Sequence, residues 1–423
     1  MDTRGLPAVG VDDFRISLEA PPANSPEFRN PQLAVLQGPD APPVDFRVPF
    51  TRAQVETALN DYAPARTWLD PLASIGSTLF MALFSGELGQ SFWRKLNDVQ
   101  ANDGYLRLRI VTSVERWQHL PWELLYDPSR GDFLSLSGRL ALVRTRADGI
   151  GKGDSTEFAP LTKLRILAAE ADVPGGLETA GDFEILRGLA AQHSDYVEVE
   201  YLAKASSETL KNALHNGSFD IFHFAGSGKV LGPTKRDGIE QSLLLWENES
   251  SQEPLDRHDL GDWLKESGVR LAIFNACHTD WVARSLARFI PAVVGFRESV
   301  GIAGCHTACA SLYSNIFSRT PLDQVVTAAR QALDRESPGT GDWCKLIFYQ
   351  QTRTGDILLD PQFPFLMRTA TISGAASKAQ PQLRLLEVYQ RNLAAAQRSP
   401  TIPESQVIEL RAKVDKIRRE LEM

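Results

Sequence analysis

The sequence contains few cysteines, no long apolar run and no cluster of basic residues. Only 4 of its 423 residues are cysteine and none forms a CxxC pair, so neither a disulfide framework nor a structural metal site is expected. No run of about 18 apolar residues is present, and the first residues contain neither a basic leader nor an apolar signal core. We therefore expect a cytoplasmic protein without membrane spans.

The net negative charge of the chain argues against nucleic acid as a partner. The formal net charge is −8 and the isoelectric point is near 5.5, while lysines and arginines are dispersed along the chain. Because phosphate binding needs clustered basic side chains, nucleic acid is not expected as a direct partner. With 43% hydrophobic residues, the chain can bury one large core or two medium cores.

Changes of pattern divide the chain into parts. The first 50 residues are rich in proline, and their short alternating segments predict a small antiparallel sheet over 13–19, 33–38 and 44–50. The stretch 147–162 has the glycine, serine and aspartate content of a connector. We assign N-terminal strands, an N-terminal part, a larger α/β domain and a helical hairpin to residues 1–50, 51–150, 163–368 and 381–423.

Apolar strands and amphipathic helices alternate after the connector. The strands are expected at 163–170, 197–202, 219–225, 242–247, 269–276 and 291–296. The helices are expected near 179–193, 207–216, 256–266, 281–289, 302–318 and 322–335. This alternation predicts a mostly parallel sheet covered by helices on both faces. Since the chemistry of such sheets lies at the carboxyl ends of strands, the ends of 219–225 and 269–276 are the candidate sites.

The C-terminal stretch shows the spacing of a helical hairpin. Apolar residues recur at steps of three and four on both sides of a turn at 399–403, and on the second side they follow coiled-coil spacing: Val407, Leu410, Val414, Ile417 and Leu421. Leaving this seam exposed would be unfavourable, so the hairpin is expected to pack on something. It either docks on its own α/β domain, or it recruits a partner or dimerises.

Cys277 and the segment around Ser227 follow the two candidate strands. Cys277 stands between a strand and a predicted helix, where thiolates are favoured, although a lone cysteine at such a place is also compatible with a core role. Gly226 and Gly228 flank Ser227 and predict a tight turn or a close backbone approach. A phosphate-binding loop does not fit the spacing. The other three cysteines are expected in the core: Cys305, Cys309 and Cys344.

Several separate motifs between about residues 60 and 366 resemble those of the CHAT domain family, a caspase-like branch of the cysteine peptidase clan that includes separases and metacaspases. The motifs are "LPWELLYDP", "GDFLSLSGRLALVR", "HFAGSG", "FNACHT", "DWCKLIFY" and "LDPQFPF". The resemblance implies a caspase-like α/β fold with helices on both faces of a mostly parallel sheet, a pseudo-caspase α/β domain over 51–150 and the hairpin as an interaction module. It also implies Cys277 as nucleophile, Gly228 as an oxyanion amide and Ser227 at the position of the general-base histidine.

The serine at position 227 departs from the family pattern. A serine hydroxyl can neither keep the thiol ionised nor protonate the leaving amine, so the site is expected to be inactive as written. His223 lies about 13 Å away along the strand and is expected to be a satisfied core histidine, while His278 is expected to point away from the thiol. Three explanations stay open: a deliberate replacement of the histidine, a natural pseudo-peptidase, or another base that restores activity.

The substrate pocket and the biological role follow from the same resemblance. Asn275 stands where metacaspases have an acidic residue, which predicts a polar but uncharged floor. Further pocket candidates are Glu298, Asp256, Arg297 and Asp259, although a solvated surface position is the more common role for such residues. The expected function is a cysteine endopeptidase that cleaves a protein partner in a bacterial defence or cell-death system, recruited through its hairpin by a sensor or adaptor, without a cofactor. The alternative is a non-catalytic scaffold that binds a peptide or partner.

Overall fold

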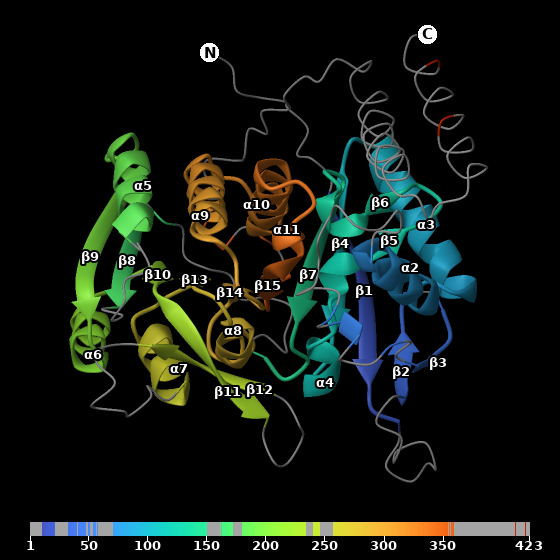
Figure 1. The fold of residues 1–423 in the computed structure, drawn as a ribbon, viewed down its shortest axis with the longest axis horizontal. Helices are drawn as coiled ribbons and strands as arrows, with labels where there is room; N and C mark the ends of the chain where they lie inside the picture. The colour runs from blue at the N-terminus through green and yellow to red at the C-terminus, as the bar shows by residue number, and fades with distance from the viewer. Residues whose placement is uncertain are drawn as a thin grey trace, which may run out of the picture.

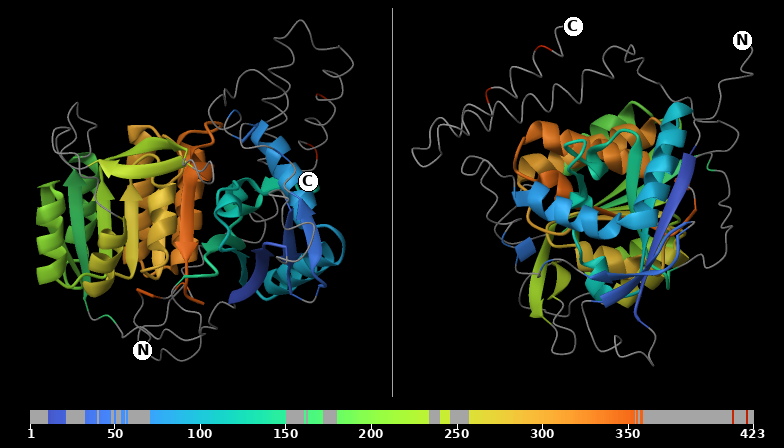
Figure 2. Two further views of the ribbon diagram at one scale, coloured as in Figure 1. Left: turned by 90° about the horizontal axis from the view of Figure 1, so that it is seen from below. Right: turned by 90° about the vertical axis from the view of Figure 1, so that its right-hand side faces the viewer.

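One sheet of 11 strands runs through the protein, with helices on both of its faces (Figures 1 and 2). The computed structural model describes residues 11–21, 33–39, 41–47, 50, 54–55, 57, 71–149, 161, 163–171, 180–233, 240–245, 257–353, 355, 357–358, 411 and 419. The strand order is β3-β2-β1-β4-β7-β15-β14-β13-β10-β8-β9. The predicted class, an α/β fold with a mostly parallel sheet, is confirmed.

The strands of the N-terminal half form one side of this sheet. They are β1 (Val11–Glu19), β2 (Leu33–Gln37), β3 (Val44–Arg47), β4 (Tyr105–Val111) and β7 (Leu140–Thr145). The other side contains β8 (Leu164–Ala171), β9 (Val197–Ala205), β10 (Ile221–Ala225), β13 (Leu271–Asn275), β14 (Ala292–Phe296) and β15 (Leu346–Gln350). The two sides meet where β15 pairs parallel to β7, while β15 is antiparallel to β14.

The helices of the second half divide between the two faces of the sheet. One face is covered by α5 (Ala180–Ala191), α9 (Ile302–Phe317) and α10 (Leu322–Glu336). The opposite face is covered by α6 (Ser207–Asn216), α7 (Arg257–Glu266) and α8 (Asp280–Leu286). Strand β10 alternates between them, because Ile221 and Ala225 pack in the first core and Phe222 and Phe224 in the second.

A third core fills the N-terminal half. The helices α2 (Pro71–Leu83) and α3 (Gly86–Ala101) pack there against β1, β4 and β7. Short elements complete the described chain: α4 (Glu115–Gln118), η2 (Trp122–Leu124), β5 (Tyr126–Asp127), β6 (Asp132–Phe133), η3 (Leu134–Leu136) and α11 (Asp342–Lys345). No single helix among the described residues is long and apolar enough to cross a membrane; α2 and α3 pass that test only as a pair, bent by 105°.

Two strand predictions need correction. Strand β2 pairs antiparallel to both β1 and β3, as expected. The three strands do not form a separate small sheet, because β1 pairs parallel to β4 and extends the main sheet. The segment predicted at 242–247 is part of β12 (Glu240–Leu245), which pairs with β11 (Ser227–Pro233) in a two-stranded hairpin outside the main sheet. A run of apolar residues does not distinguish a strand of the main sheet from one in such a hairpin. The C-terminal hairpin predicted over 381–423 lies outside the described residues apart from Arg411 and Arg419.

A buried carboxylate joins the two halves. Glu123, in η2, is fully buried and accepts hydrogen bonds from Arg144 of β7, one of them at 2.9 Å, and from Arg330 of α10 at 3.5 Å. Arg330 also donates to the backbone oxygens of Leu142 and Leu346. Burial raises the pKa of Glu123, but the charge and hydrogen bonds of Arg144 lower it more, so the pKa lies below its usual value.

Replacing this carboxylate tests its contribution. We expect Glu123→Gln to lower the free energy of unfolding by about 3–5 kcal/mol, because two buried guanidinium groups lose their counter-ion. Urea denaturation measures this, with Glu87→Gln on the exposed surface of α3 as the control. Since the folded-state pKa is lowered, the wild-type contribution is present above the unfolded-state pKa of about 4.3 and is lost as pH falls below it. An equal loss in both variants would contradict the assignment.

Candidate active site

The two candidate segments leave neighbouring strands at the same edge of the sheet. Strands β10 and β13 are parallel, and Ala225 is the register partner of Asn275. Ser227 and Cys277 each follow two residues later. Because adjacent strands lie about 4.8 Å apart, the register brings the two positions to adjoining strand ends. The side chain of Ser227 lies outside the described part of the structure, so its role and that of Gly228 stay predictions.

The chain turns sharply after Ala225. A single residue, Gly226, separates β10 from β11, in which the backbones of Ser227 and Gly228 pair with Leu245 and Leu244. A Cβ atom on Gly226 would lie 2.7 Å from the ring of Phe224 and 3.1 Å from the Cβ of Ala171. The expected close approach therefore applies to Gly226.

Cys277 lies in the turn between β13 and α8, as predicted, and is half-buried. Its Sγ donates to the backbone oxygen of Val300 at 3.7 Å. The Sγ of Cys305 approaches the same oxygen at 3.9 Å. Cys305 packs against the core as expected, but it is only half-buried and lies beside the candidate nucleophile. Burial, together with the nearby Cys277 and Asp182, raises the pKa of Cys305 to about 12. Cys309 and Cys344 are buried as expected.

The turn after Cys277 contains His278 and Thr279, which make different contacts. His278 has a left-handed φ of 55°, an uncommon conformation for a residue other than glycine. Its ring contacts the segment before Val300, since Nε2 lies 3.0 Å from Ser299 Oγ and Nδ1 lies 3.8 Å from Glu298. Thr279 is buried; its hydroxyl donates to the Ala276 oxygen at 3.0 Å and accepts from the Phe296 amide at 3.0 Å. These bonds tie the turn to β14.

Asn275 is a buried support rather than an open pocket floor. Its Nδ2 donates to the carboxylate of Asp182 and, at 3.1 Å, to the backbone oxygen of Cys305. Both amide hydrogens are therefore used inside the protein. Sequence reasoning missed Asp182, which stands in the first turn of α5, far from Asn275 in the chain. The only sequence signal for it was an acidic residue at the start of a predicted helix.

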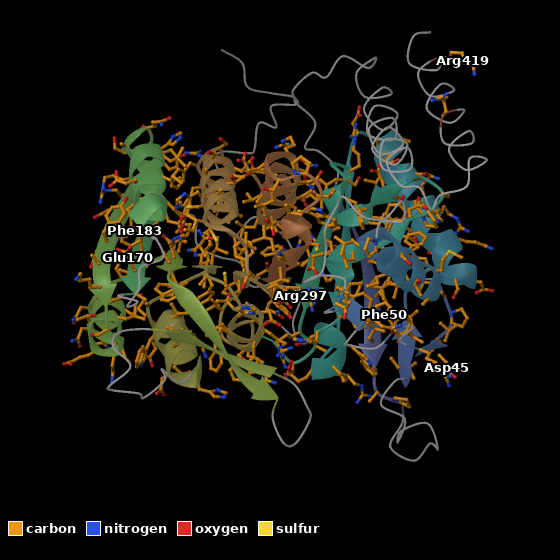
Figure 3. All side chains as sticks on the ribbon, in the orientation of Figure 1. Asp45, Phe50, Glu170, Phe183, Arg297 and Arg419 are labelled. Atoms are coloured by element: carbon orange, nitrogen blue, oxygen red, sulfur yellow. The ribbon has the colours of Figure 1, made fainter. Side chains whose placement is uncertain are left out.

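The remaining pocket candidates differ in placement. Glu298 is partly exposed and lies within 4 Å of His278. Arg297 is buried between the two halves, where Nη2 donates to the His119 oxygen at 2.5 Å (Figure 3). Arg297 is therefore not a pocket charge. Asp259 is exposed on α7, and Asp256 lies outside the described residues.

His223 is buried as predicted, but it is not satisfied. Neither of its ring nitrogens has a hydrogen-bond partner among the described residues, and its Nε2 lies 3.9 Å from the Asp182 carboxylate. In the described part of the chain, no hydrogen bond or ion pair connects His223, His278 or His306 to the Cys277 thiol.

Comparisons with known proteins agree with the motifs. The family model described as the CHAT domain matches residues 75–343. The complex of the pro- and mature domains of RgpB from Porphyromonas gingivalis is similar with 11% identity, a TM-score of 0.41, and coverage of 67% of this chain and 72% of that chain. A separase–securin complex from Saccharomyces cerevisiae is similar with 9% identity, a TM-score of 0.44, and coverage of 81% of this chain and 30% of that chain. These scores are too low to carry an argument. No curated protein matches.

Removing the hydroxyl of Thr279 tests whether it stabilises the turn that follows Cys277. We expect Thr279→Val to lower the free energy of unfolding by about 1–3 kcal/mol, because the buried amide of Phe296 loses its acceptor. Urea denaturation measures the loss. Ser285→Ala in α8 is the control with a smaller expected effect, since its hydroxyl donates to a carbonyl of its own helix. Equal stability of Thr279→Val and wild type would contradict this role.

Proposed function

The chain belongs to the CHAT domain family, and on that premise we propose that it is a cysteine endopeptidase whose catalytic pair is interrupted at Ser227. The observation that carries the proposal is the register of Ala225 with Asn275, which supports a pairing of position 227 with the Cys277 thiol. The 75–343 match includes both positions.

The proposed chemistry needs two groups. The thiolate of Cys277 attacks a peptide carbonyl of the substrate, and the resulting acyl-enzyme is released by water. An imidazole at position 227 would take the thiol proton and pass it to the leaving amine. A serine supplies neither step, and the loss of a general acid–base group costs on the order of 10²–10⁴ in rate. With serine at position 227, the protein is therefore a slow or inactive peptidase.

A second candidate function is favoured by Ser227 itself. Without a base, the same fold can act as a scaffold that binds a peptide or a partner protein and does not cut it. In both cases we propose a protein partner and an effector role in a bacterial defence or cell-death system. Recruitment by a sensor or adaptor through the hairpin over 381–423 is part of the same proposal and rests on the heptad spacing alone.

Restoring the imidazole tests the proposal. We would incubate the original chain, Ser227→His, Ser227→Asn and Ser227→His combined with Cys277→Ala with a peptide library derived from a bacterial proteome. Mass spectrometry identifies new termini. We expect cleavage by Ser227→His at least about 10²-fold above the original chain, and none after Cys277→Ala or with Ser227→Asn. Equal cleavage by the original chain would place the base elsewhere. Cleavage by no variant would favour the scaffold.

A further inference from the structure

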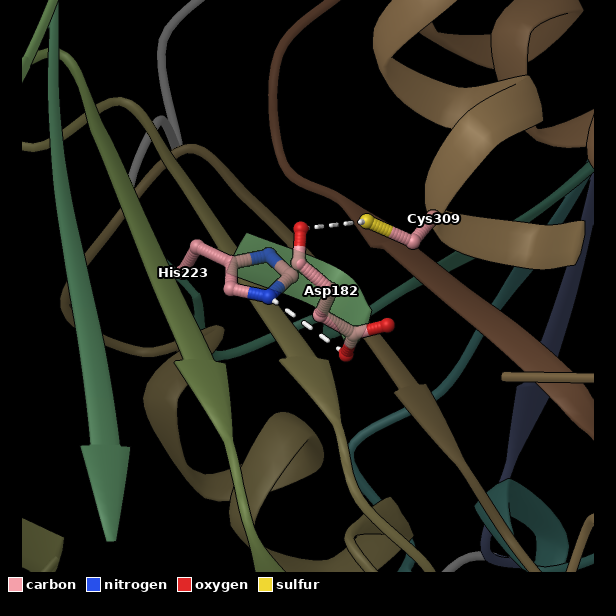
Figure 4. Close-up of side chains that lie close together, drawn as sticks. All are labelled: Asp182, His223 and Cys309. Carbon is pink, nitrogen blue, oxygen red and sulfur yellow. Dashed lines mark hydrogen bonds and ion pairs between the residues drawn. The ribbon is translucent and has the colours of Figure 1, made fainter. Parts of the chain in front are cut away.

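Three possible metal ligands meet in the core beneath the strand ends (Figure 4). Asp182 comes from the first turn of α5, His223 from the middle of β10 and Cys309 from α9. One ligand atom of each residue lies within 4.8 Å of the others. The residues are almost completely buried, with exposed fractions of 3%, 0% and 0%.

The imidazole of His223 is the first sign that the cluster lacks a component. Both ring nitrogens are buried and neither has a hydrogen-bond partner among the described residues. The nearest carboxylate oxygen, on Asp182, is 3.9 Å from Nε2 and beyond hydrogen-bond distance. The ring of Tyr313 packs beside the imidazole at 5.5 Å and does not satisfy it. An unpaired buried polar group of this kind requires an explanation such as an ion or a water molecule.

The charge of Asp182 is the second sign. One carboxylate oxygen accepts a hydrogen bond from the Asn275 amide, and the other, Oδ1, has no hydrogen-bond partner in the part of the chain that the structure describes. Within the described chain, no lysine or arginine forms an ion pair with this carboxylate; only His223 and His306 come within 4 Å. A buried carboxylate without a permanent counter-ion is costly. A divalent cation bound by this carboxylate and one thiolate would leave no net charge in the core.

We propose that Asp182, His223 and Cys309 bind one zinc ion. Oxygen, nitrogen and sulfur donors together suit zinc in tetrahedral coordination. Metal–ligand distances of about 2.0–2.3 Å require ligand atoms roughly 3.3–3.8 Å apart, so the cluster closes by about 1 Å when it binds the ion. The Cys309 sulfur, which now lies 3.9 Å from the backbone oxygen of Asp182, turns toward the ion and releases its proton to solvent.

His306 is the fourth ligand in this arrangement. It precedes Cys309 by three residues on α9, a spacing that places two side chains on one helix face. Its Nε2 lies 3.9 Å from Asp182 Oδ1, the oxygen without a hydrogen-bond partner. Its side chain is 30% exposed, so it lies on the open side of the cluster, from which an ion can enter.

The proposed ion would fasten the elements that surround the candidate active site. Strand β10 leads to Ser227, α5 supplies the carboxylate that holds Asn275, and the first turns of α9 carry Cys305 beside Cys277. The site does not depend on the proposed peptidase activity, because none of its ligands is a reacting group. Sequence patterns do not reveal it, since three separate elements contribute the ligands.

Metal analysis of the full chain tests the proposal. The parent for the experiment is Cys277→Ala, which removes the thiol of the candidate nucleophile. We would strip it with a chelator, refill it with zinc and count metal by mass spectrometry. We expect one zinc per chain, at least a tenfold loss of zinc affinity in Cys309→Ser, and no loss in Cys344→Ser, which replaces an equally buried thiol away from the cluster.

Cobalt substitution identifies the ligand. The cobalt form of the parent should show a thiolate-to-cobalt charge-transfer band that Cys309→Ser removes and Cys344→Ser retains. No bound zinc in the refilled parent, or equal zinc affinity after Cys309→Ser, would overturn the proposal. If Cys309→Ser does not fold, the same cobalt spectrum is recorded for the parent that also carries Cys305→Ser and Cys344→Ser. Cys309 is the last thiol in that variant. A thiolate-to-cobalt band in this variant supports the proposed site, and the absence of the band overturns the proposal.

Discussion

The parallel register of β10 and β13 sets how the two candidate segments lie relative to each other. Ala225 opposite Asn275 places position 227 and Cys277 at adjoining strand ends. A slip by one residue would move one partner by about 3.3 Å and turn every side chain of the strand to the other face. The apolar pattern of β10 opposes such a slip, since Phe222 and Phe224 pack on the core under α6, α7 and α8.

Polar side chains buried under helices α5 and α9 then hold the strand ends in place. Asp182 is at the centre, because it binds Asn275 next to the nucleophile turn and approaches His223 and His306. A second polar group, around Glu123, joins the N-terminal half to α10. Both groups bury charge, and buried charges are costly unless they are paired. The Glu123 group is paired by arginines, whereas the Asp182 group is paired only by histidines, and this difference motivates the proposed ion.

The sequence predicted local structure well and tertiary neighbours poorly. The helix expected at 207–216 has those bounds, and the strands at 219–225 and 269–276 were placed within two residues at each end, because periodicity and capping residues are local signals. Three features were not predictable in this way. The pairing of β12 with β11, the contact of Cys277 with Val300 and the contact of Asp182 with Asn275 all join residues that are not neighbours in the chain.

The reactivity of one thiol tests the central claim, that position 227 and Cys277 form a pair, without any substrate. We would measure the alkylation rate of Cys277 by iodoacetamide from about pH 5 to about pH 9, by peptide mass spectrometry, in the original chain and in Ser227→His. A facing imidazolium would stabilise the thiolate, so alkylation of Ser227→His should be roughly tenfold faster or more near pH 6.5. Ser227→Asn should follow the original chain. Identical pH profiles for the original chain and Ser227→His would contradict the pairing.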